Sequence, residues 1–229
     1  MKDLFEKYGI DYDCESLEKL DIFKRLLKEY GSKFNITAVL DDEGINVKHF
    51  LDSVLYVDKF STNAEVIEIG SGGGFPSIPN KILRNDLNFT LVEATGKKCE
   101  FLKTAVKELG LKGVTVLNAR AEELGQDKKY REKYDYAIAR AVAGMNVLSE
   151  LCLPLVKISG KFVAYKGNAE EELNAAKSAI KTLGGKVNEV YSFELPCGAG
   201  KREIIEVEKV FKTDIKYPRQ YAKIKKSPL

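Results

Sequence analysis

The sequence predicts an α/β protein with a mostly parallel sheet of about seven strands, an antiparallel last strand and an N-terminal helical extension. Two observations predict this fold class. From Glu65 onward, short apolar segments alternate with segments of helical spacing, which is typical of a parallel sheet covered by helices on both faces. Before Glu65, the spacing of the apolar residues is mainly helical.

The extension is expected to span residues 1–60. Its first clear helix has apolar residues three and four positions apart, namely Leu17, Leu20, Phe23, Leu27 and Tyr30. Ser16 suits the N-cap of this helix and Gly31 its C-terminal stop. Helical spacing resumes at Val47, Phe50, Val54 and Val57.

Seven segments then have strand character. They are Val66–Ile69, Phe89–Glu93, Val114–Leu117, Tyr136–Ala139, Lys161–Tyr165, Asn188–Phe193 and Glu203–Val207. Helices are expected between them over 97–110, 144–156 and 170–185. The link between the last two strands is too short for a crossover helix, so they should pair as a hairpin. Residues 61–212 would thus form a Rossmann-like core within one domain of 229 residues.

Composition excludes several classes of protein. No apolar run reaches the roughly 18 residues of a membrane span, and the acidic N-terminus does not resemble a signal peptide. The four cysteines are scattered and His49 is the single histidine, so no set of metal ligands can be identified from spacing. We expect a cytoplasmic protein with reduced cysteines, without a structural metal and without membrane association.

Charge is distributed unevenly along the chain. Residues 1–60 contain 9 Lys and Arg against 13 Asp and Glu, whereas the last fourteen residues, KYPRQYAKIKKSPL, contain five basic residues and no acidic one. A basic tail over 213–229 that includes Tyr217 and Tyr221 suits phosphate contacts and base stacking. The alternative, and the commoner case for an isolated basic tail, is a solvated terminus.

The stretch VIEIGSGGGFPSIP ends the first strand in a glycine-rich loop. Loops at the carboxyl ends of parallel strands bind ligands, and glycine lets the backbone approach them closely. The glycines are Gly70, Gly72, Gly73 and Gly74. Their spacing differs from the G-x-G-x-x-G pattern of nicotinamide dinucleotide sites. Glu68 would repel a pyrophosphate but suits a cationic ligand; the alternative is a solvated charge at the strand end.

Two later segments reduce the number of ligand classes that fit the glycine-rich loop. Glu93 ends the second strand, 19 residues after Gly74, where a carboxylate can bind both hydroxyls of a ribose. Ala121 and Glu122 follow the third strand, where an adenine ring would lie. No G-x-x-x-x-G-K-[ST] phosphate loop is present. These features favour S-adenosylmethionine, an adenosyl cation without phosphate, over NAD or ATP.

Four basic residues are expected at the same edge of the sheet. Arg120, Arg140 and Lys166 follow the third, fourth and fifth strands, and Arg202 begins the seventh. Together they suggest a polyanionic substrate. The chain lacks the Asn/Asp-Pro-Pro-aromatic loop of exocyclic amino methylation and a suitably placed cysteine for pyrimidine carbon methylation. Guanine N7 has a free lone pair and loses no proton, so it is a compatible acceptor that this pattern does not by itself establish.

Motifs along the chain carry a resemblance to a known family. They are FNITAV, KHFLDSV, EIGSGGGFPSIP, LVEATGKKCEFL, NARAEEL, YAIARAVA, YKG and the terminal YPR…KKSPL. In these motifs and their order, essentially the whole chain resembles the bacterial 16S ribosomal RNA guanine-N7 methyltransferases, also called glucose-inhibited division protein B. The resemblance implies a sheet of the S-adenosylmethionine-dependent methyltransferase type. It also implies 16S ribosomal RNA as the partner, in a small-subunit ribosomal particle, and a monomeric protein is favoured.

The expected cofactor contacts follow from this resemblance and from the loop. They are Gly70, Gly72, Gly74, Phe75, Glu93, Ala94, Thr95, Ala121, Glu122 and Arg140. Arg120, Arg140, Lys166 and Arg202 are expected to position RNA or the acceptor base, and no catalytic residue is assigned. Ser77 departs from the glycine of the family's G-F-P-G-I-P run, which bears on the affinity of the cofactor and not on its identity.

Three residues of the N-terminal motifs, Asn35, His49 and Asp52, receive no chemical role, and His49 is expected to be a satisfied core histidine. Two other functions stay open at this point. One is a nicotinamide-dependent oxidoreductase, and the other is an RNA-binding module that has a methyltransferase fold without catalysis.

Overall fold

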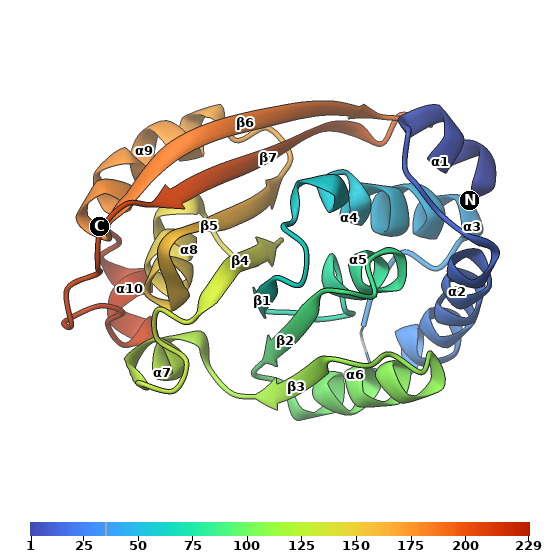
Figure 1. The fold of residues 1–229 in the computed structure, drawn as a ribbon, viewed down its shortest axis with the longest axis horizontal. Coiled ribbons are helices and arrows are strands. Elements are labelled where there is room, and N and C mark those ends of the chain that lie inside the picture. The colour runs from blue at the N-terminus through green and yellow to red at the C-terminus, as the bar shows by residue number, and fades with distance from the viewer. Residues whose placement is uncertain (35) are drawn as a thin grey trace.

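The computed structural model describes residues 1–34 and 36–229, and a seven-stranded sheet lies between two layers of helices (Figure 1). The strand order is β3-β2-β1-β4-β5-β7-β6. The strands are β1 (Glu65–Ile69), β2 (Asn88–Glu93), β3 (Val114–Asn118), β4 (Tyr134–Arg140), β5 (Val156–Lys166), β6 (Gly185–Leu195) and β7 (Gly200–Lys209). The first five pair in parallel, and β7 is antiparallel to both β5 and β6. The predicted sheet and its terminal hairpin are therefore confirmed.

Several element boundaries differ from the prediction. The helix expected over 144–156 ends at Cys152, and Leu153–Leu155 form a single 3₁₀ turn before β5 begins. Pro154 lies in this turn and, having no backbone N–H, cannot continue the α-helical hydrogen bonds. β6 and β7 extend beyond the expected ranges, and Tyr8 donates a hydrogen bond to the carbonyl of Glu194 near their tip, at 2.8 Å.

One face of the sheet is covered by the N-terminal helices and by the first two helices of the alternating region (Figure 1). These helices are α1 (Lys2–Tyr8), α2 (Cys14–Phe34), α3 (Asp42–Gly44), α4 (Asp52–Val54), α5 (Ser77–Leu83) and α6 (Gly96–Glu108). Phe23 of α2 packs against Phe50, Phe75 and Phe101, with ring centroids 5.4–6.5 Å apart. Phe75 follows the glycine loop, so this aromatic core joins the extension to the loop.

The helix α2 has ends that differ from the prediction. It begins at Cys14 and the Asp13 carboxylate accepts a hydrogen bond from the backbone N–H of Ser16 at 2.7 Å, so Asp13 and not Ser16 is the capping residue. Gly31 does not stop the helix, which continues to Phe34. A Cβ at Gly31 would lie 2.6 Å from Leu40 Cδ2, so this glycine allows the following segment to pack closely.

The second helical stretch of the extension contains a π-helical segment, Ile45–Leu51, between α3 and α4, and Val57–Lys59 form a further 3₁₀ turn. The helical character was predicted, but the wider turns were not. π-Helical turns are rare and often occur at functional sites. Here the segment carries Lys48 and His49 and ends beside Asp52.

The other face of the sheet is covered by α7 (Ala121–Gln126), α8 (Met145–Cys152), α9 (Glu170–Thr182) and α10 (Tyr221–Lys226). α10 belongs to the basic tail, and Tyr217 and Ile224 of this tail are buried in the core of this face. The prediction of a solvated terminus is therefore wrong for these residues, because the tail has apolar side chains that the sheet face buries.

Within the described residues, no helix combines the length and the apolar character that crossing a bilayer requires. Nor does the described part of the chain bring together three or more histidine, cysteine, aspartate or glutamate side chains that could hold a metal ion. Asn35, one of the residues of the N-terminal motifs, lies outside the described residues.

Candidate functional site

The glycine loop lies where the direction of strand progression reverses, between β1 and β4, which is the usual ligand-binding point of such sheets. Gly70 has φ of 70°, and the backbone N–H groups of Gly70 and Ser71 both donate to the carbonyl of Val92, at 2.9 and 3.0 Å. A Cβ at Gly70 would lie 2.6 Å from Val142 Cγ2. The loop is thus tied to the end of β2 in a conformation that L side chains rarely adopt.

A hollow of about 400 Å³ lies beside the loop, and we call it the loop hollow. Of the ten expected cofactor residues, five line it: Gly70, Gly72, Phe75, Glu93 and Arg140. A Cβ on Gly72 would meet only the carbonyl oxygen of Gly70, at 3.8 Å, so a side chain there would project into open space. The backbone can therefore approach a ligand at this point.

Glu93 is 7% exposed and its carboxylate is fixed by the backbone. Oε2 accepts the N–H of Gly72 at 3.0 Å, and Oε1 accepts the N–H of Thr95 at 2.8 Å. A carboxylate has about four lone-pair sites, so each oxygen keeps capacity for a further donor. Two adjacent hydroxyls, such as those of a ribose, are suitable donors for these sites.

The other five expected cofactor residues do not line the loop hollow. Gly74 has φ of 86°, and a Cβ there would clash with Ile78. Ala94 and Thr95 are exposed residues beyond β2, Ala121 is buried at the start of α7, and Glu122 lines a separate hollow with Arg120.

A second hollow, of about 420 Å³, adjoins the first, and we call it the arginine hollow. Three of the four predicted basic residues line it: Arg140, Lys166 and Arg202. His49, Arg140 and Ala141 line both hollows, so these three residues form a shared wall.

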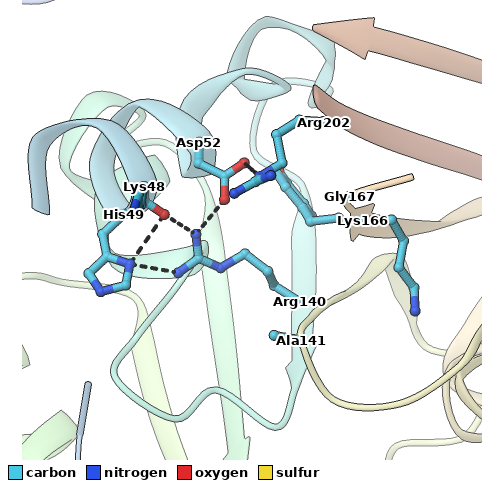
Figure 2. Close-up of a pocket in the computed structure, with 9 residues that line it drawn as sticks. Lys48, His49, Asp52, Arg140, Ala141, Lys166, Gly167 and Arg202 are labelled. Carbon is cyan, nitrogen blue, oxygen red and sulfur yellow. Dashed lines mark hydrogen bonds and ion pairs between the residues drawn. The ribbon is translucent and has the colours of Figure 1, made fainter. Parts of the chain in front are cut away.

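Asp52 lies between two arginines in the arginine hollow (Figure 2). Its Oδ2 accepts from Arg140 Nη1 at 2.8 Å, and its Oδ1 accepts from Arg202 Nε at 3.1 Å. The ammonium of Lys166 points away from this group in Figure 2, because it donates to the carbonyl of Ala143 and the carboxylate of Glu172, both at 2.6 Å.

Arg120 does not join the other three basic residues, contrary to the prediction. It precedes α7 and lines a hollow with Tyr221 of α10. β3 is the edge strand and lies five positions from β7 in the sheet, which is roughly 24 Å at about 4.8 Å per strand. The ends of these strands share an edge but are too far apart for Arg120 and Arg202 to meet.

His49 stacks on Phe75 with ring centroids 4.4 Å apart, and its Nε2 lies 2.7 Å from Thr37 Oγ1. Burial and the nearby Arg140 guanidinium lower the pKa of His49 from 6.5 to about 4. The imidazole is therefore neutral at pH 7. The expectation that it is a satisfied histidine is confirmed, but it lies in the wall of both hollows and not in the core alone.

Glu68 lies beneath the glycine loop and is fully buried, so the alternative of a solvated charge is wrong. It is not among the residues that line the loop hollow. Burial raises the pKa of Glu68 from 4.5 to about 7, and the neighbouring hydroxyls of Ser77 and Ser71 oppose the rise. Neither carboxylate oxygen has a hydrogen-bond partner at normal geometry among the described residues, nor does Ser77 Oγ.

Several residues of the two hollows were not predicted from the sequence. Lys48, Asp52 and Ala141 line the arginine hollow, and Lys98 and Val142 line the loop hollow. Lys48 and Asp52 both belong to the motif KHFLDSV. His49 and Asp52 are three positions apart, which places two residues on the same face of a helix. This spacing was the available signal that Asp52 lies near His49.

Known proteins of one family are similar to this chain over most of its length. A family model described as rRNA small subunit methyltransferase G matches residues 16–205. Ribosomal RNA small subunit methyltransferase G of Acetivibrio thermocellus is 43% identical over 226 residues, covering 97% of this chain and 92% of that protein. The protein of the same name from Halalkalibacterium halodurans is 44% identical over 228 residues, covering 98% and 95%.

Solved structures show the same fold at low identity. A SAM dependent methyltransferase from Aquifex aeolicus superposes with a TM-score of 0.55 at 16% identity, covering 74% of this chain and 94% of that one. The nicotinamide-dependent oxidoreductase and the non-catalytic RNA-binding module gain no support from these comparisons.

Proposed function

Since the chain belongs to the GidB family, rRNA small subunit methyltransferase G, we propose that it transfers a methyl group from S-adenosylmethionine to N7 of a guanine in 16S ribosomal RNA. The observation that carries this proposal is the shared wall of His49, Arg140 and Ala141 between two hollows. Methyl transfer needs a donor and an acceptor in line, and the two hollows provide adjoining places for them.

The loop hollow binds the cofactor, which supplies a methyl group activated by its sulfonium. Glu93 accepts the ribose hydroxyls, and the Gly70 and Gly72 backbone allows close approach. Phe75 stacks on His49, with ring centroids 4.4 Å apart, and the guanidinium of Arg140 lies 5.0 Å from the centroid of the Phe75 ring. This packing fixes the wall at which the transfer takes place.

The acceptor needs no general base. The lone pair of guanine N7 is available and no proton leaves on methylation. His49 is neutral at pH 7 because its pKa is about 4, so it adds no positive charge beside the ring, which becomes cationic. The residues of the wall thus orient the reactants and do not move a proton.

The RNA approaches the arginine hollow, where Arg140 and Arg202 are available to phosphate or base oxygens. Lys48 lines the same hollow, and the exposed lysines of α10 offer further phosphate contacts. We place the reaction in the cytoplasm, on a small-subunit ribosomal particle, with the protein acting as a single-domain monomer. The residues that line the hollows are the proposed cofactor and RNA contacts.

The test is methylation of small ribosomal subunits prepared from cells that lack this protein. Radiolabelled S-adenosylmethionine should transfer its methyl group to 16S RNA, and borohydride followed by aniline should cleave the RNA at one guanine. Calorimetry should show that S-adenosylmethionine binds and that NADH does not compete. Absence of label in RNA from subunits and from naked RNA, with cofactor bound, would exclude the proposed activity.

A further inference from the structure

Asp52 is the only carboxylate among the described residues that line the arginine hollow. Six other side chains of this hollow carry hydrogen-bond donors, namely Lys48, His49, Arg140, Tyr165, Lys166 and Arg202. Two of them neutralise Asp52, one at each oxygen, at 2.8 and 3.1 Å. The aspartate is therefore an acceptor in a hollow that otherwise offers mainly donors.

The two arginines do not use the full capacity of the carboxylate. A carboxylate has about four lone-pair sites, two on each oxygen. One arginine hydrogen bond occupies Oδ1 and the other occupies Oδ2, which leaves one site on each oxygen. The carboxylate is also held in place, because Asp52 begins α4 and is 4% exposed, and both arginines are part-buried around it (Figure 2).

Guanine is the nucleobase that matches two adjacent acceptors. Its N1–H and its N2 amino group are neighbouring donors on the Watson–Crick edge. Adenine and cytosine each present an amino group next to a ring-nitrogen acceptor, and uracil presents one N–H between two carbonyls. These bases would place a lone pair against the carboxylate, which costs free energy when both groups lose water.

We propose that Asp52 is the residue that selects guanine, by accepting hydrogen bonds from N1–H and N2–H₂ of the acceptor base in the arginine hollow. The proposal rests on the proposed function, because it assigns the acceptor to that hollow. The Watson–Crick edge is opposite to N7 on the purine. Holding the base by that edge leaves N7 free to face the shared wall and the loop hollow.

Arg140 and Arg202 hold the carboxylate of Asp52 in position. Arg140 also donates to the carbonyl of Lys48 at 3.0 Å, and Arg202 to the carbonyl of Lys201 at 2.9 Å. Each guanidinium is therefore anchored to backbone as well as to Asp52, and the pair positions the carboxylate. Arg140 and Arg202 come from β4 and β7, so the specificity residue is fixed by strands on both sides of β5.

The experiment compares guanosine with inosine at the methylated position. Inosine lacks the N2 amino group but keeps N1–H and N7, so the substitution removes only the proposed hydrogen bond from the amino group. The position is the guanine found by the cleavage experiment above, and the inosine is introduced by ligation of RNA that is then assembled into small subunits. Wild-type protein should favour guanosine in kcat/KM by about 10-fold to 100-fold, the size expected for a hydrogen bond to a charged group.

Asp52→Asn should lose this preference, because the amide retains one acceptor and turns a donor toward the donors of the base. Its guanosine-to-inosine ratio should fall well below the wild-type ratio, while calorimetry should show unchanged affinity for S-adenosylmethionine. Arg202→Lys is the matched control. It disturbs the same ion pair but keeps the carboxylate, so it should lower both rates and keep a clear preference for guanosine.

The outcomes separate the two proposals. Failure of wild-type protein to methylate guanosine RNA would overturn the proposed function. Equal rates of wild-type protein on guanosine and inosine would overturn the role of Asp52 while leaving the function intact, even if the aspartate variant did not fold. An Asp52→Asn protein that loses rate equally on both RNAs and keeps the wild-type ratio would show a purely structural role for the aspartate.

Discussion

Glu93 combines two tasks in one carboxylate. It accepts backbone hydrogen bonds from Gly72 and Thr95, and it is 7% exposed in the lining of the loop hollow. These hydrogen bonds stabilise the glycine loop against the end of β2. In the proposed function, they also keep the remaining lone pairs of the carboxylate in place for a ribose.

Glu93→Ala should weaken binding of S-adenosylmethionine by about 1–3 kcal/mol, the usual cost of losing hydrogen bonds to a charged group. Calorimetry measures the change, and thermal unfolding without ligand measures the part that comes from the loop itself. Glu100→Ala, at an exposed residue of α6, is the control. Unchanged affinity in the Glu93 variant would show that the ribose is bound elsewhere.

Glu68 is a buried acid, and this makes stability depend on pH. Its pKa is about 7 in the folded protein and about 4.5 in the unfolded chain. Between these values the unfolded chain releases its proton first, so stability falls as pH rises from about 4.5 to about 7, and the loss persists above that. A pKa shift of this size corresponds to a decrease in the free energy of unfolding on the order of 3 kcal/mol.

Glu68→Gln should remove that part of the pH dependence. Urea unfolding between pH 5 and pH 8 should show a steeper loss of stability in the wild-type protein than in the variant. Glu108→Gln, at an exposed residue, is the control and should follow the wild type. The lowered pKa of His49 acts in the opposite direction, at acid pH, and is common to all three proteins. Parallel curves for Glu68→Gln and wild type would contradict a buried, weakly acidic Glu68.

The seven strands could be predicted because their apolar runs and the helices between them leave few alternatives. The ends of helices were harder to predict. Asp13 and Ser16 are both good N-cap residues, and only the backbone position shows that Asp13 is used. The π-helical turns at 45–51 leave no clear mark in the apolar spacing.

The site could be predicted only in part for a related reason. Glu93 and the glycines lie at motif positions next to strand ends, so spacing along the chain located them. Asp52 meets Arg140 and Arg202, which are 88 and 150 positions away in the sequence. This contact depends on the strand order and on the packing of α4. The spacing of residues along the sequence determines neither of them.

The hydrogen bond that caps α2 should contribute to the stability of the protein. Asp13→Ala removes the acceptor of the Ser16 N–H and should reduce the free energy of unfolding by about 0.5–2 kcal/mol. Urea unfolding measures it, with Asp11→Ala, an exposed residue before the helix, as the matched control. The affinity for S-adenosylmethionine should not change. Equal stabilities of the two variants would show that the hydrogen bond to Asp13 contributes little to α2.

The C-terminal tail completes the second face of the sheet. Arg219 pairs with the fully buried Glu150 through Nε at 2.8 Å and Nη2 at 2.6 Å. Arg131 donates to the carbonyls of Gly125 and Tyr217, both at 2.7 Å. The tail therefore has a structural part, built from Tyr217, Arg219 and Ile224, and a solvent-facing part that carries exposed lysines.

Two variants should distinguish the structural part of the tail from its solvent-facing part. Arg219→Ala removes the guanidinium that neutralises the buried Glu150 and leaves only the backbone N–H of residue 219 donating to it at 2.9 Å, so the variant should lower the free energy of unfolding by about 3–5 kcal/mol. The exposed side chains of Lys223, Lys225 and Lys226 have no such buried partner to leave behind among the described residues. Replacing all three with alanine should change stability by no more than about 0.5 kcal/mol per site, and alanine suits α10.

The triple variant should instead change RNA binding. Each lysine that binds a phosphate releases counterions, so the slope of log affinity against log salt should decrease by about 0.7–0.9 for each such lysine replaced. Filter binding of 16S RNA at several salt concentrations measures this slope, and calorimetry should give wild-type affinity for S-adenosylmethionine. An unchanged slope would remove α10 from the RNA surface. In that case, the arginine hollow and its surroundings would have to supply the phosphate contacts alone, and the basic character of the tail would have no part in binding RNA.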